Sequence, residues 1–295
     1  TCFGANDGSI TITNPLGGYG TYEYSINGGS TWQASGTYIN LAPATYNVQI
    51  RDAANPACII ILNGALVITG PAALSATVTS TNVTCFGANN GIITITSPTG
   101  GWGTYQYSVN GGTTWSAIGN FTSLAPGTYD VRMRDAAYTG CFIILNPALV
   151  ITQPAVLNAT LSSINVTCFG ATDGSITITN PTGGYGTYEY TVNGGGAWQA
   201  SGSFTGLGPG TYNVQIRDAA HPGCITVLNN SLAITQPAVL KATVTPTMVT
   251  CNGANDGIIA ITAPSGGFGT YEYSIDGGTT WQASGTFSGL TPANY

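Results

Sequence analysis

The sequence predicts an all-β protein built from tandem sandwich modules, and three observations lead to that prediction. The first is an internal repeat with a period of about 83 residues, which spaces the cysteines and tryptophans evenly along the chain. The second is an alternation of apolar and polar residues, which is typical of strands with one buried face. The third is a series of Gly and Pro clusters that separate these strands at roughly the 8–12 residue spacing of a β-sandwich.

The repeat is visible in the positions of single residue types. Its markers recur once in each period: Cys2, Cys85, Cys168 and Cys251; Cys58, Cys141 and Cys224; and Trp32, Trp115, Trp198 and Trp281. Residues 1–83 and 167–249 align without a gap and are identical at 59 of 83 positions. Copies that are so similar favour a spacer, a filament or a multivalent binder.

Each unit is expected to contain about seven strands. In the second unit they are predicted at 74–79, 92–96, 105–109, near Trp115, near Phe121, at 129–134 and at 141–152. Seven short strands in one unit predict an immunoglobulin-like or fibronectin III-like β-sandwich. The segments 124–129 and 207–212 resemble the corner of fibronectin type III domains, where a tyrosine hydroxyl bonds back to the upstream backbone.

Three prolines indicate where one module gives way to the next. Pro71, Pro154 and Pro237 recur with the same period in a Gly/Gln-Pro-Ala linker. This frame predicts a partial module at 1–71 without its first strand, complete modules at 72–154 and 155–237, and a partial module at 238–295 without its last strands. Because the sequence starts and stops inside units, we expect it to be a piece of a longer protein.

Charged residues are scarce in this chain. They make up 5% of it, with five Lys and Arg residues and a net charge of −6, against ~25% in ordinary globular proteins. Clustered Lys and Arg would be needed to neutralise phosphates, so we exclude nucleic acid as a partner. No apolar run approaches the ~20 residues of a membrane span.

A surface with so little charge needs another source of solubility. Dense glycosylation, burial in an assembly and a hydroxyl-rich exterior would each supply it. Asn-x-Ser/Thr triplets give five candidate N-glycosylation sites: Asn82, Asn120, Asn158, Asn165 and Asn229. Thr and Ser offer O-glycosylation sites as well.

Each unit has two cysteines, a pattern typical of structural disulfides in an oxidising compartment outside the cytosol. Zinc is a poor alternative, because the chain has one histidine and no close pair of ligands. We therefore treat all seven cysteines as disulfide candidates: Cys2, Cys58, Cys85, Cys141, Cys168, Cys224 and Cys251.

Three pairing schemes fit the repeat, and counting does not choose between them. Pairing within the frame, our working expectation, joins Cys2 to Cys58, Cys85 to Cys141 and Cys168 to Cys224. Pairing between neighbours joins Cys58 to Cys85, Cys141 to Cys168 and Cys224 to Cys251. The third scheme joins Cys2 to Cys141 and Cys85 to Cys224, and it would link adjacent modules covalently.

We predict no enzyme activity. A single histidine and three glutamates in exposed strand positions leave no triad or carboxylate pair within a unit. Residues 25–32 resemble the Asp-box of sialidases, a hairpin in which Asn and Gly supply positive φ and the Trp packs back on the strands. The Asp-box has no chemistry of its own, and the arginines are too dispersed for a sialidase site. The recurring Arg-Asp at 51–52, 134–135 and 217–218 is expected to form a local ion pair or an Asp-capped turn.

Two kinds of binding site are stated as hypotheses. Four aromatic residues occupy equivalent positions in a Gly-Gly-x-Gly loop: Tyr19, Trp102, Tyr185 and Phe268. Such a ring would stack on carbohydrate, cap the core or pack on the neighbouring unit. Asp7, Asp173 and Asp256 would suit calcium, although Asn90 replaces the Asp in the second unit and a turn explains them more simply. We otherwise expect no cofactor and no metal.

The complete unit resembles a known family. Its segments Cys-Phe-Gly-Ala-Asn-Asn-Gly at 85–91, Gly-Gly-Trp-Gly-Thr-Tyr at 100–105 and Ile-Thr-Gln-Pro at 151–154 are similar to SprB-type repeats, and the resemblance extends over every copy. Such repeats occur in very large cell-surface adhesins of Bacteroidota, which the type IX secretion system exports and which act in gliding or attachment.

This resemblance implies an extracellular location on a bacterial surface. With the similarity of the copies, it predicts a disulfide-stabilised, glycosylated fibre or adhesin stalk. Its partners would be its own neighbouring modules and further copies, assembled into a filament. The alternative is a multivalent array of modules that bind surface polysaccharide.

Overall fold

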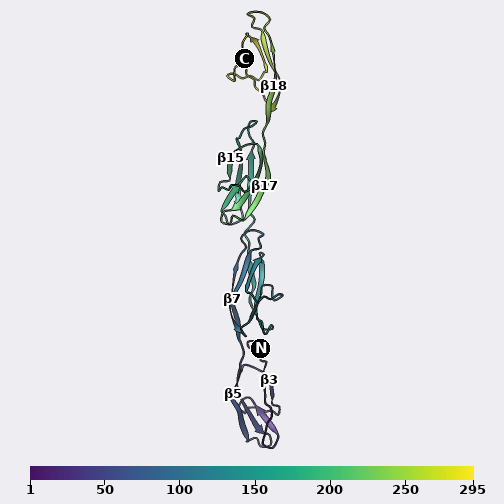
Figure 1. Cartoon of the computed structure of the whole chain (residues 1–295), viewed down its shortest axis with the longest axis vertical. Coiled ribbons are helices and arrows are strands. Elements are labelled where there is room, and N and C mark those ends of the chain that lie inside the picture. The colour runs from purple at the N-terminus through teal and green to yellow at the C-terminus, as the bar shows by residue number, and fades with distance from the viewer. The chain divides into compact units, whose positions relative to one another are not determined.

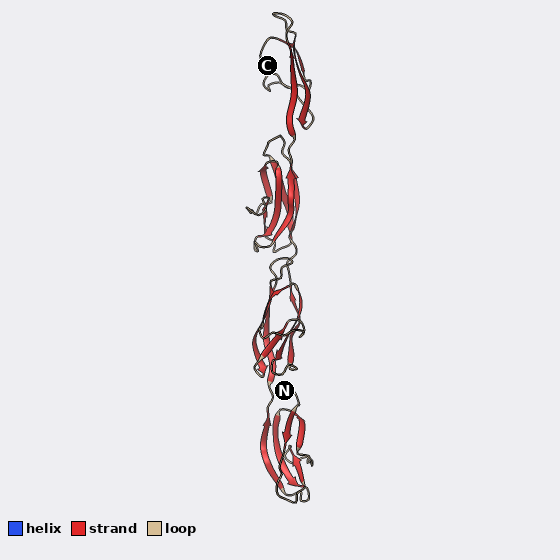
Figure 2. Ribbon diagram, turned by 45° about the vertical axis from the view of Figure 1, so that its right-hand side comes forward, coloured by secondary structure: helices blue, strands red, loops and turns tan.

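The computed structural model describes residues 1–295 and contains 20 strands and no helix (Figure 2). The strands form seven small antiparallel sheets, which confirms the prediction of an all-β fold of tandem sandwiches. The chain divides into two compact units, residues 1–153 and 154–295. With strands alone, the structure offers no helix of the length and apolarity that crossing a bilayer requires.

Residues 72–153 show the architecture of a repeat most fully. Their strands are β6 (Ala72–Thr81), β7 (Gly91–Gly101), β8 (Tyr105–Ser108), β9 (Asn120–Leu124), β10 (Gly127–Asp135) and β11 (Phe142–Ile151). One sheet has the order β6-β7-β9 and the other β11-β10-β8. Six side chains from the strands of both sheets and Val83, which follows β6, meet in one core of seven buried residues: Val83, Ile93, Ile95, Tyr107, Val131, Met133 and Ile151.

The strand expected near Trp115 is not formed, so six strands replace the predicted seven. This segment makes only one bridge, between Tyr107 and Ser116. The reason lies in the preceding turn, where the Asn110 side chain accepts a hydrogen bond of 3.0 Å from the backbone N–H of Thr114. Local bonds of this kind occupy the backbone groups that a strand ladder would need.

Residues 1–71, coloured purple to blue in Figure 1, contain five strands of the same types. They are β1 (Gly8–Thr11), β2 (Tyr22–Ser25), β3 (Thr37–Leu41), β4 (Ala44–Asp52) and β5 (Ile59–Ile68). Their sheets have the orders β1-β3 and β2-β4-β5. The order matches that of residues 72–153, except that no counterpart of β6 pairs with β1.

In residues 154–295 the two-sheet arrangement occurs once more, at 154–237, and residues 238–295 form one further sheet. The strands of residues 154–295 are β12 (Asn158–Ile164), β13 (Gly174–Thr182), β14 (Tyr188–Thr191), β15 (Ser203–Leu207), β16 (Gly210–Asp218), β17 (Ile225–Ile234), β18 (Ala238–Thr247), β19 (Gly257–Gly267) and β20 (Thr286–Leu290). The sheets are β12-β13-β15, β14-β16-β17 and β18-β19-β20. The module boundaries that we placed at the three prolines stay predictions.

The tyrosine corner is present in each copy. The Tyr129 hydroxyl donates a hydrogen bond of 2.7 Å to the backbone carbonyl of Ala125, and Tyr212 does the same to Gly208 at 2.8 Å. This bond fixes the turn that leads into the central strand of the second sheet, as the resemblance to fibronectin type III corners predicted.

Candidate functional site at the junction between repeats

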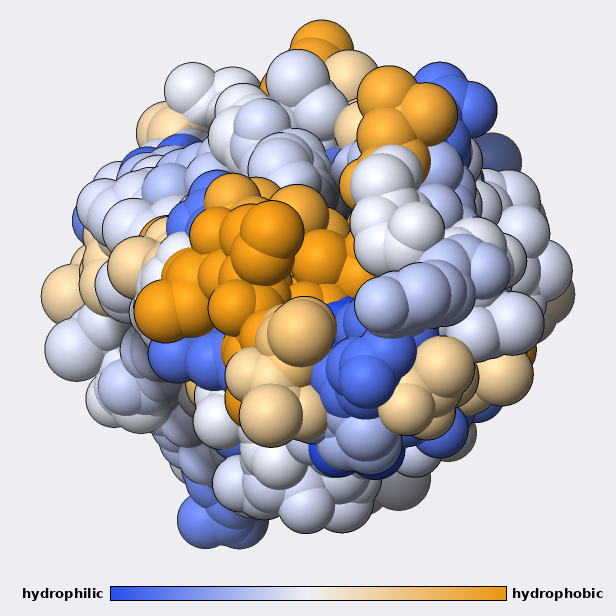
Figure 3. All heavy atoms as spheres, turned by 90° about the horizontal axis from the view of Figure 1, so that it is seen from below, coloured by the Kyte–Doolittle hydropathy of each residue, from blue (hydrophilic) through white to orange (hydrophobic).

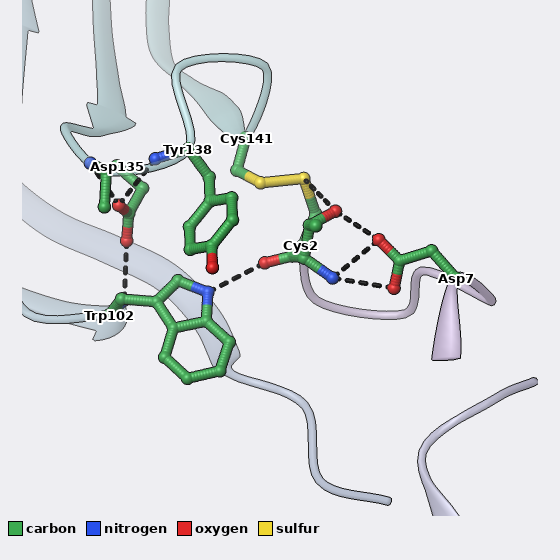
Figure 4. Close-up of a disulfide and its surroundings, with 8 residues drawn as sticks. Cys2, Asp7, Trp102, Asp135, Tyr138 and Cys141 are labelled. Carbon is green, nitrogen blue, oxygen red and sulfur yellow. Dashed lines mark hydrogen bonds and ion pairs between the residues drawn. A yellow bond between two sulfur atoms is a disulfide. The ribbon is translucent and has the colours of Figure 1, made fainter. Parts of the chain in front are cut away.

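The disulfide Cys2–Cys141 joins the loop before β1 to the turn between β10 and β11, across 139 residues of sequence (Figure 4). The two Cα atoms are 5.3 Å apart, within the usual range for disulfides. This bond belongs to the third pairing scheme, which links adjacent repeats. Our working expectation of a Cys2–Cys58 bond is wrong, and so is the neighbour bond Cys141–Cys168.

The position of β4 explains why Cys2 and Cys58 do not pair. Gly8 pairs with Leu41, and the chain turns from there into β4, so Cys2 lies near the first residue of that strand. Cys58 comes after its last residue. The nine residues of β4 span roughly 30 Å at about 3.3 Å per residue, whereas a disulfide joins Cα atoms only about 5.5 Å apart.

The seven cysteines fall into two groups. Cys2, Cys85, Cys141 and Cys224 are disulfide-bonded. Cys58, Cys168 and Cys251 are exposed thiols, although we had counted them among the disulfide candidates. The third pairing scheme makes the same division, because it uses Cys2, Cys85, Cys141 and Cys224 and leaves the other three cysteines without a partner among residues 1–295.

The loop that brings Cys2 to the junction has a defined shape. We call residues 1–5 the donor loop, and its copies are residues 84–88, 167–171 and 250–254. The Ala5 N–H donates to the carbonyl of Cys2 at 3.0 Å, and Gly4 between them has a φ of +72°, which favours glycine. The Thr1 hydroxyl donates to the carboxylate of Asp7. The loop is therefore held by its own hydrogen bonds.

The aspartates that would suit calcium lie two residues after the donor loops and accept hydrogen bonds from the threonines that begin them. Asp173 accepts from the Thr167 backbone N–H at 3.0 Å and also from the Thr167 hydroxyl, and these bonds lower its pKa. Thr250 lowers the pKa of Asp256 in the same way. The turn interpretation accounts for the recurrence of these residues.

The surface that receives the donor loop is organised by one buried carboxylate. We call Gly101, Trp102, Asp135 and Cys141 the acceptor surface. Asp135 is fully buried and accepts three backbone N–H bonds: 2.5 Å from Trp102, 2.8 Å from Ala137 and 3.1 Å from Tyr138. It thereby ties the aromatic loop to the turn that leads to Cys141. The Arg-Asp pattern thus marks an Asp-capped turn.

Glycine is required beside this carboxylate. Gly101 has a φ of +57°, and a Cβ atom there would collide with the Asp135 carboxylate and with Leu74. The close approach of the Gly-Gly-x-Gly loop to Asp135 explains why the loop has this composition.

Trp102 is the aromatic residue of the acceptor surface, and it contacts the preceding repeat. Its indole Nε1 donates a hydrogen bond of 2.8 Å to the carbonyl of Thr1, and its ring packs on Tyr138 with centroids 5.6 Å apart (Figure 4). Of the three roles considered for this position, Trp102 takes that of packing on the neighbouring unit.

The other three aromatic residues at this position differ in their surroundings. Tyr185 packs on His221 with ring centroids 4.3 Å apart. Tyr19 and Phe268 are 80% and 78% exposed, against 50% for Trp102. Contact between these four aromatic residues and a glycan stays a prediction.

The Asp-box-like hairpin is confirmed as a structural device. Gly28 and Gly29 have φ values of +68° and +86°, and the Asn27 side chain accepts the N–H of Thr31 at 2.9 Å. The Trp32 ring lies back on the sheet, with the Arg51 guanidinium 4.5 Å from its centroid. This tryptophan serves packing.

The candidate N-glycosylation sites lie mostly on exposed positions. Asn82, Asn120, Asn158 and Asn165 are exposed, whereas Asn229 is half-buried within β17. Asn82 also accepts a hydrogen bond of 2.8 Å from the backbone N–H of Thr152. Attachment of glycans at these sites stays a prediction.

A comparison with protein families agrees with the repeat. The model of the SprB repeat matches four segments: residues 1–31, 77–114, 160–197 and 243–280. The search of curated proteins gives no match. Each matched segment includes a donor loop, and two of the three segments that carry the resemblance, 85–91 and 100–105, lie within the second match. The chain is therefore a SprB-type repeat region.

Proposed function

We propose that this region is the structural part of a bacterial extracellular surface fibre or adhesin stalk. The observation that favours this function most is the Cys2–Cys141 disulfide. It joins one repeat to the next, whereas a bond confined to one repeat would stabilise only that repeat. A connector that must transmit force benefits from covalent junctions.

Non-covalent contacts at the same junction support the proposal. The Trp102 indole holds the backbone of the donor loop, and Asp135 fixes the loop that presents Trp102. A backbone carbonyl is available in any donor sequence, so this hydrogen bond suits a junction that is repeated many times. Each repeat then needs only one donor loop and one acceptor surface.

The location and the covalent modifications belong to the same proposal. Disulfides between repeats suit an oxidising exterior, and SprB repeats are adhesin repeats and not an enzyme family. With 5% charged residues, the surface would gain solubility from glycans at the exposed asparagines or from the association of copies into a filament.

A second function is favoured by the exposed aromatic rings. Tyr19 and Phe268 project from Gly-Gly-x-Gly loops, and such rings stack on sugars. Copies of a weak polysaccharide site would act together through avidity. Polysaccharide binding would use the same Gly-Gly-x-Gly loops as the junction, but it requires that no donor loop covers their aromatic rings.

Electron cryo-microscopy of the native material tests the stalk directly. We expect regularly spaced modules, density for a bond between repeats at Cys2–Cys141 and its equivalents, and extra density on Asn, Thr or Ser. Flexible beads without density between repeats would contradict the stalk.

A glycan array probed with the 295-residue chain separates the two functions. The stalk predicts no binding. Polysaccharide binding that is lost in the double variant Tyr19→Ala/Phe268→Ala, but kept in Trp102→Ala, would favour the second function instead, because Trp102 faces the junction.

A further inference from the structure

β6 and β12 lie at sheet edges in residues 72–153 and 154–237, the two stretches that contain a complete two-sheet repeat. β6 pairs with β7 and β12 pairs with β13, and no strand pairs along the other side of either. Each of these repeats has a further repeat before and after it in the sequence, so the free edge is a feature of the repeat itself. A free edge presents N–H and C=O groups that can pair with another chain.

The other edges of a complete repeat are less suited to pairing. β8 and β9 have four and five residues, whereas β6 has ten. β11 and β17 are long, but the register of each is interrupted twice, and such bulges bend a strand. Thr77–Thr81 of β6 and Thr160–Ile164 of β12 pair with their neighbours without interruption. These two segments are therefore the regular free edges.

The direction of the free backbone groups in β6 follows from its pairing. Ser80 lies opposite Ile93. Ile95, two residues further along β7, donates its N–H to the carbonyl of Gly119, toward β9. Alternate residues of a strand direct their backbone groups to the same neighbour, so Ile93 faces β9 as well. Ser80, which is exposed, therefore directs its N–H away from the sheet.

The equivalent strand β18 supports this assignment and shows how an edge is protected. Its Pro246 has the register position that Ser80 has in β6 and Ser163 has in β12. Proline has no N–H, and it fits in a sheet where that group would point away from the neighbouring strand. β18 also contains Lys241. Lysine and proline both protect edges from pairing, and neither occurs in β6 or β12.

Charge does not oppose the approach of two such edges. The charged residues of residues 72–153 are Asp130, Arg132, Arg134 and Asp135, all in β10 of the other sheet. β6, β7 and β9 contain none. Figure 3 shows a surface of similar character, in which most side chains are of intermediate hydropathy and one apolar patch stands out. Two copies can therefore meet along this sheet without repulsion between like charges.

We infer that Thr77–Thr81 and Thr160–Ile164 are edges through which this chain pairs with a second copy of itself. An antiparallel pair is symmetric, so the same edge can serve on both sides of a twofold contact. A second copy carries both edges, so two weak pairings act together, which a single foreign strand does not offer. The inference rests on the self-association in the proposed function and deepens it, because it names the edges through which copies meet.

Sedimentation of the 295-residue chain over a range of concentrations tests the inference. The free thiols at Cys58, Cys168 and Cys251 are first alkylated without reduction, which keeps Cys2–Cys141 and prevents new disulfides. We expect reversible association that rises with concentration. A chain that stays monomeric would overturn this contact but leave the stalk and its Cys2–Cys141 bond standing, whereas glycan binding in the array would remove the stalk and leave this contact.

Lysine at the free edges should weaken the association. The double variant Ser75→Lys/Asn158→Lys places lysine at the positions equivalent to Lys241, and it should raise the dissociation constant about tenfold or more. Thr122→Lys/Thr205→Lys is the matched control. It adds the same charge at exposed positions of β9 and β15, on the opposite edges of the same sheets, and should leave the dissociation constant unchanged. Equal effects of the two variants would refute pairing through β6 and β12.

Hydrogen exchange identifies the edge directly. The Ser80 and Ser163 amides should exchange about tenfold more slowly in associated protein than in dilute protein, because each then has an acceptor on the second copy. The Ile95 amide, which is bonded within its own sheet, should be equally protected in both samples. Association without slower exchange at Ser80 and Ser163 would place the contact elsewhere and overturn the inference.

Discussion

The acceptor surface occurs twice in residues 1–153, once occupied and once open. Around Cys141 it holds the donor loop through a disulfide and an indole hydrogen bond. Around Cys58 the same carboxylate geometry is present, but the aromatic ring is exposed and the thiol is free. The comparison shows that the aspartate forms the surface whether or not a donor loop is bound. The aromatic ring and the cysteine are the residues that contact a bound loop.

Among the tests of this comparison, removal of the Cys2–Cys141 disulfide should have the largest effect, a decrease in the free energy of unfolding. Cys2–Cys141 closes a loop of 139 residues, for which the chain-entropy description gives about 4–5 kcal/mol. We expect Cys141→Ser to lower the free energy of unfolding of residues 1–153 by up to this amount, measured by urea unfolding and circular dichroism. Cys58→Ser at the open surface is the control and should stay within about 0.5 kcal/mol. Equal curves for both variants would show that the bond adds nothing to the fold.

Removal of the carboxylate should have the next largest effect. In Asp135→Ala three backbone N–H groups at a buried position lose their acceptor, which costs about 3 kcal/mol. The variant should also speed reduction of Cys2–Cys141 by dithiothreitol, because Trp102 is no longer held in place. Asp52→Ala is the matched change at the open surface and should leave the rate of that reduction unchanged. If reduction is equally fast in the wild-type chain and in Asp135→Ala, Asp135 does not position Trp102.

A pH titration of the donor loops should give the smallest effect. Hydrogen bonds from Thr167 hold the pKa of Asp173 below its usual value of 3.8, so this stabilisation is present at neutral pH and is lost as the pH falls through the lowered pKa. We expect protection of the Thr167 amide against hydrogen exchange to fall below about pH 3.8.

Residues 84–88 supply the internal control for this titration. There the Thr84 N–H donates to the neutral side chain of Asn90 at 3.1 Å, which has no carboxylate to protonate. The Thr84 amide should keep its protection over the same pH range. Parallel loss at both threonines would mean that acid acts on the fold as a whole.

Much of the fold could be predicted from the sequence because its signals are local. The alternation in Tyr22–Ser25 sets a strand, and Asn27 with two glycines sets a turn, since each depends on residues a few positions apart. The prediction of a strand near Trp115 was wrong because competing hydrogen bonds decide the structure there. The residues of this segment have suitable propensity, but side chains in the preceding turn compete for the same backbone groups.

The candidate site was only partly predictable. The positions of Trp102 and Cys141 followed from the repeat, yet carbohydrate stacking and packing on a neighbour were equally compatible with an aromatic residue in that loop. The role of Asp135 could have been predicted, because every complete unit contains both this aspartate and the Gly-Gly-x-Gly loop. A buried carboxylate needs several N–H donors, and the backbone of such a loop can supply them.

The sequence by itself determined the period, the strand-forming segments, the tyrosine corners and the prediction that cysteines form structural disulfides. Only the tertiary structure decided that Cys2 bonds to Cys141 and that Trp102 holds the preceding repeat. The repeat places every cysteine pair in an equivalent frame, so spacing cannot distinguish partners within a repeat from partners in the next. That choice is made by the length of β4, which separates Cys2 from Cys58, and by the turn at Asp135, which presents Cys141 to the donor loop.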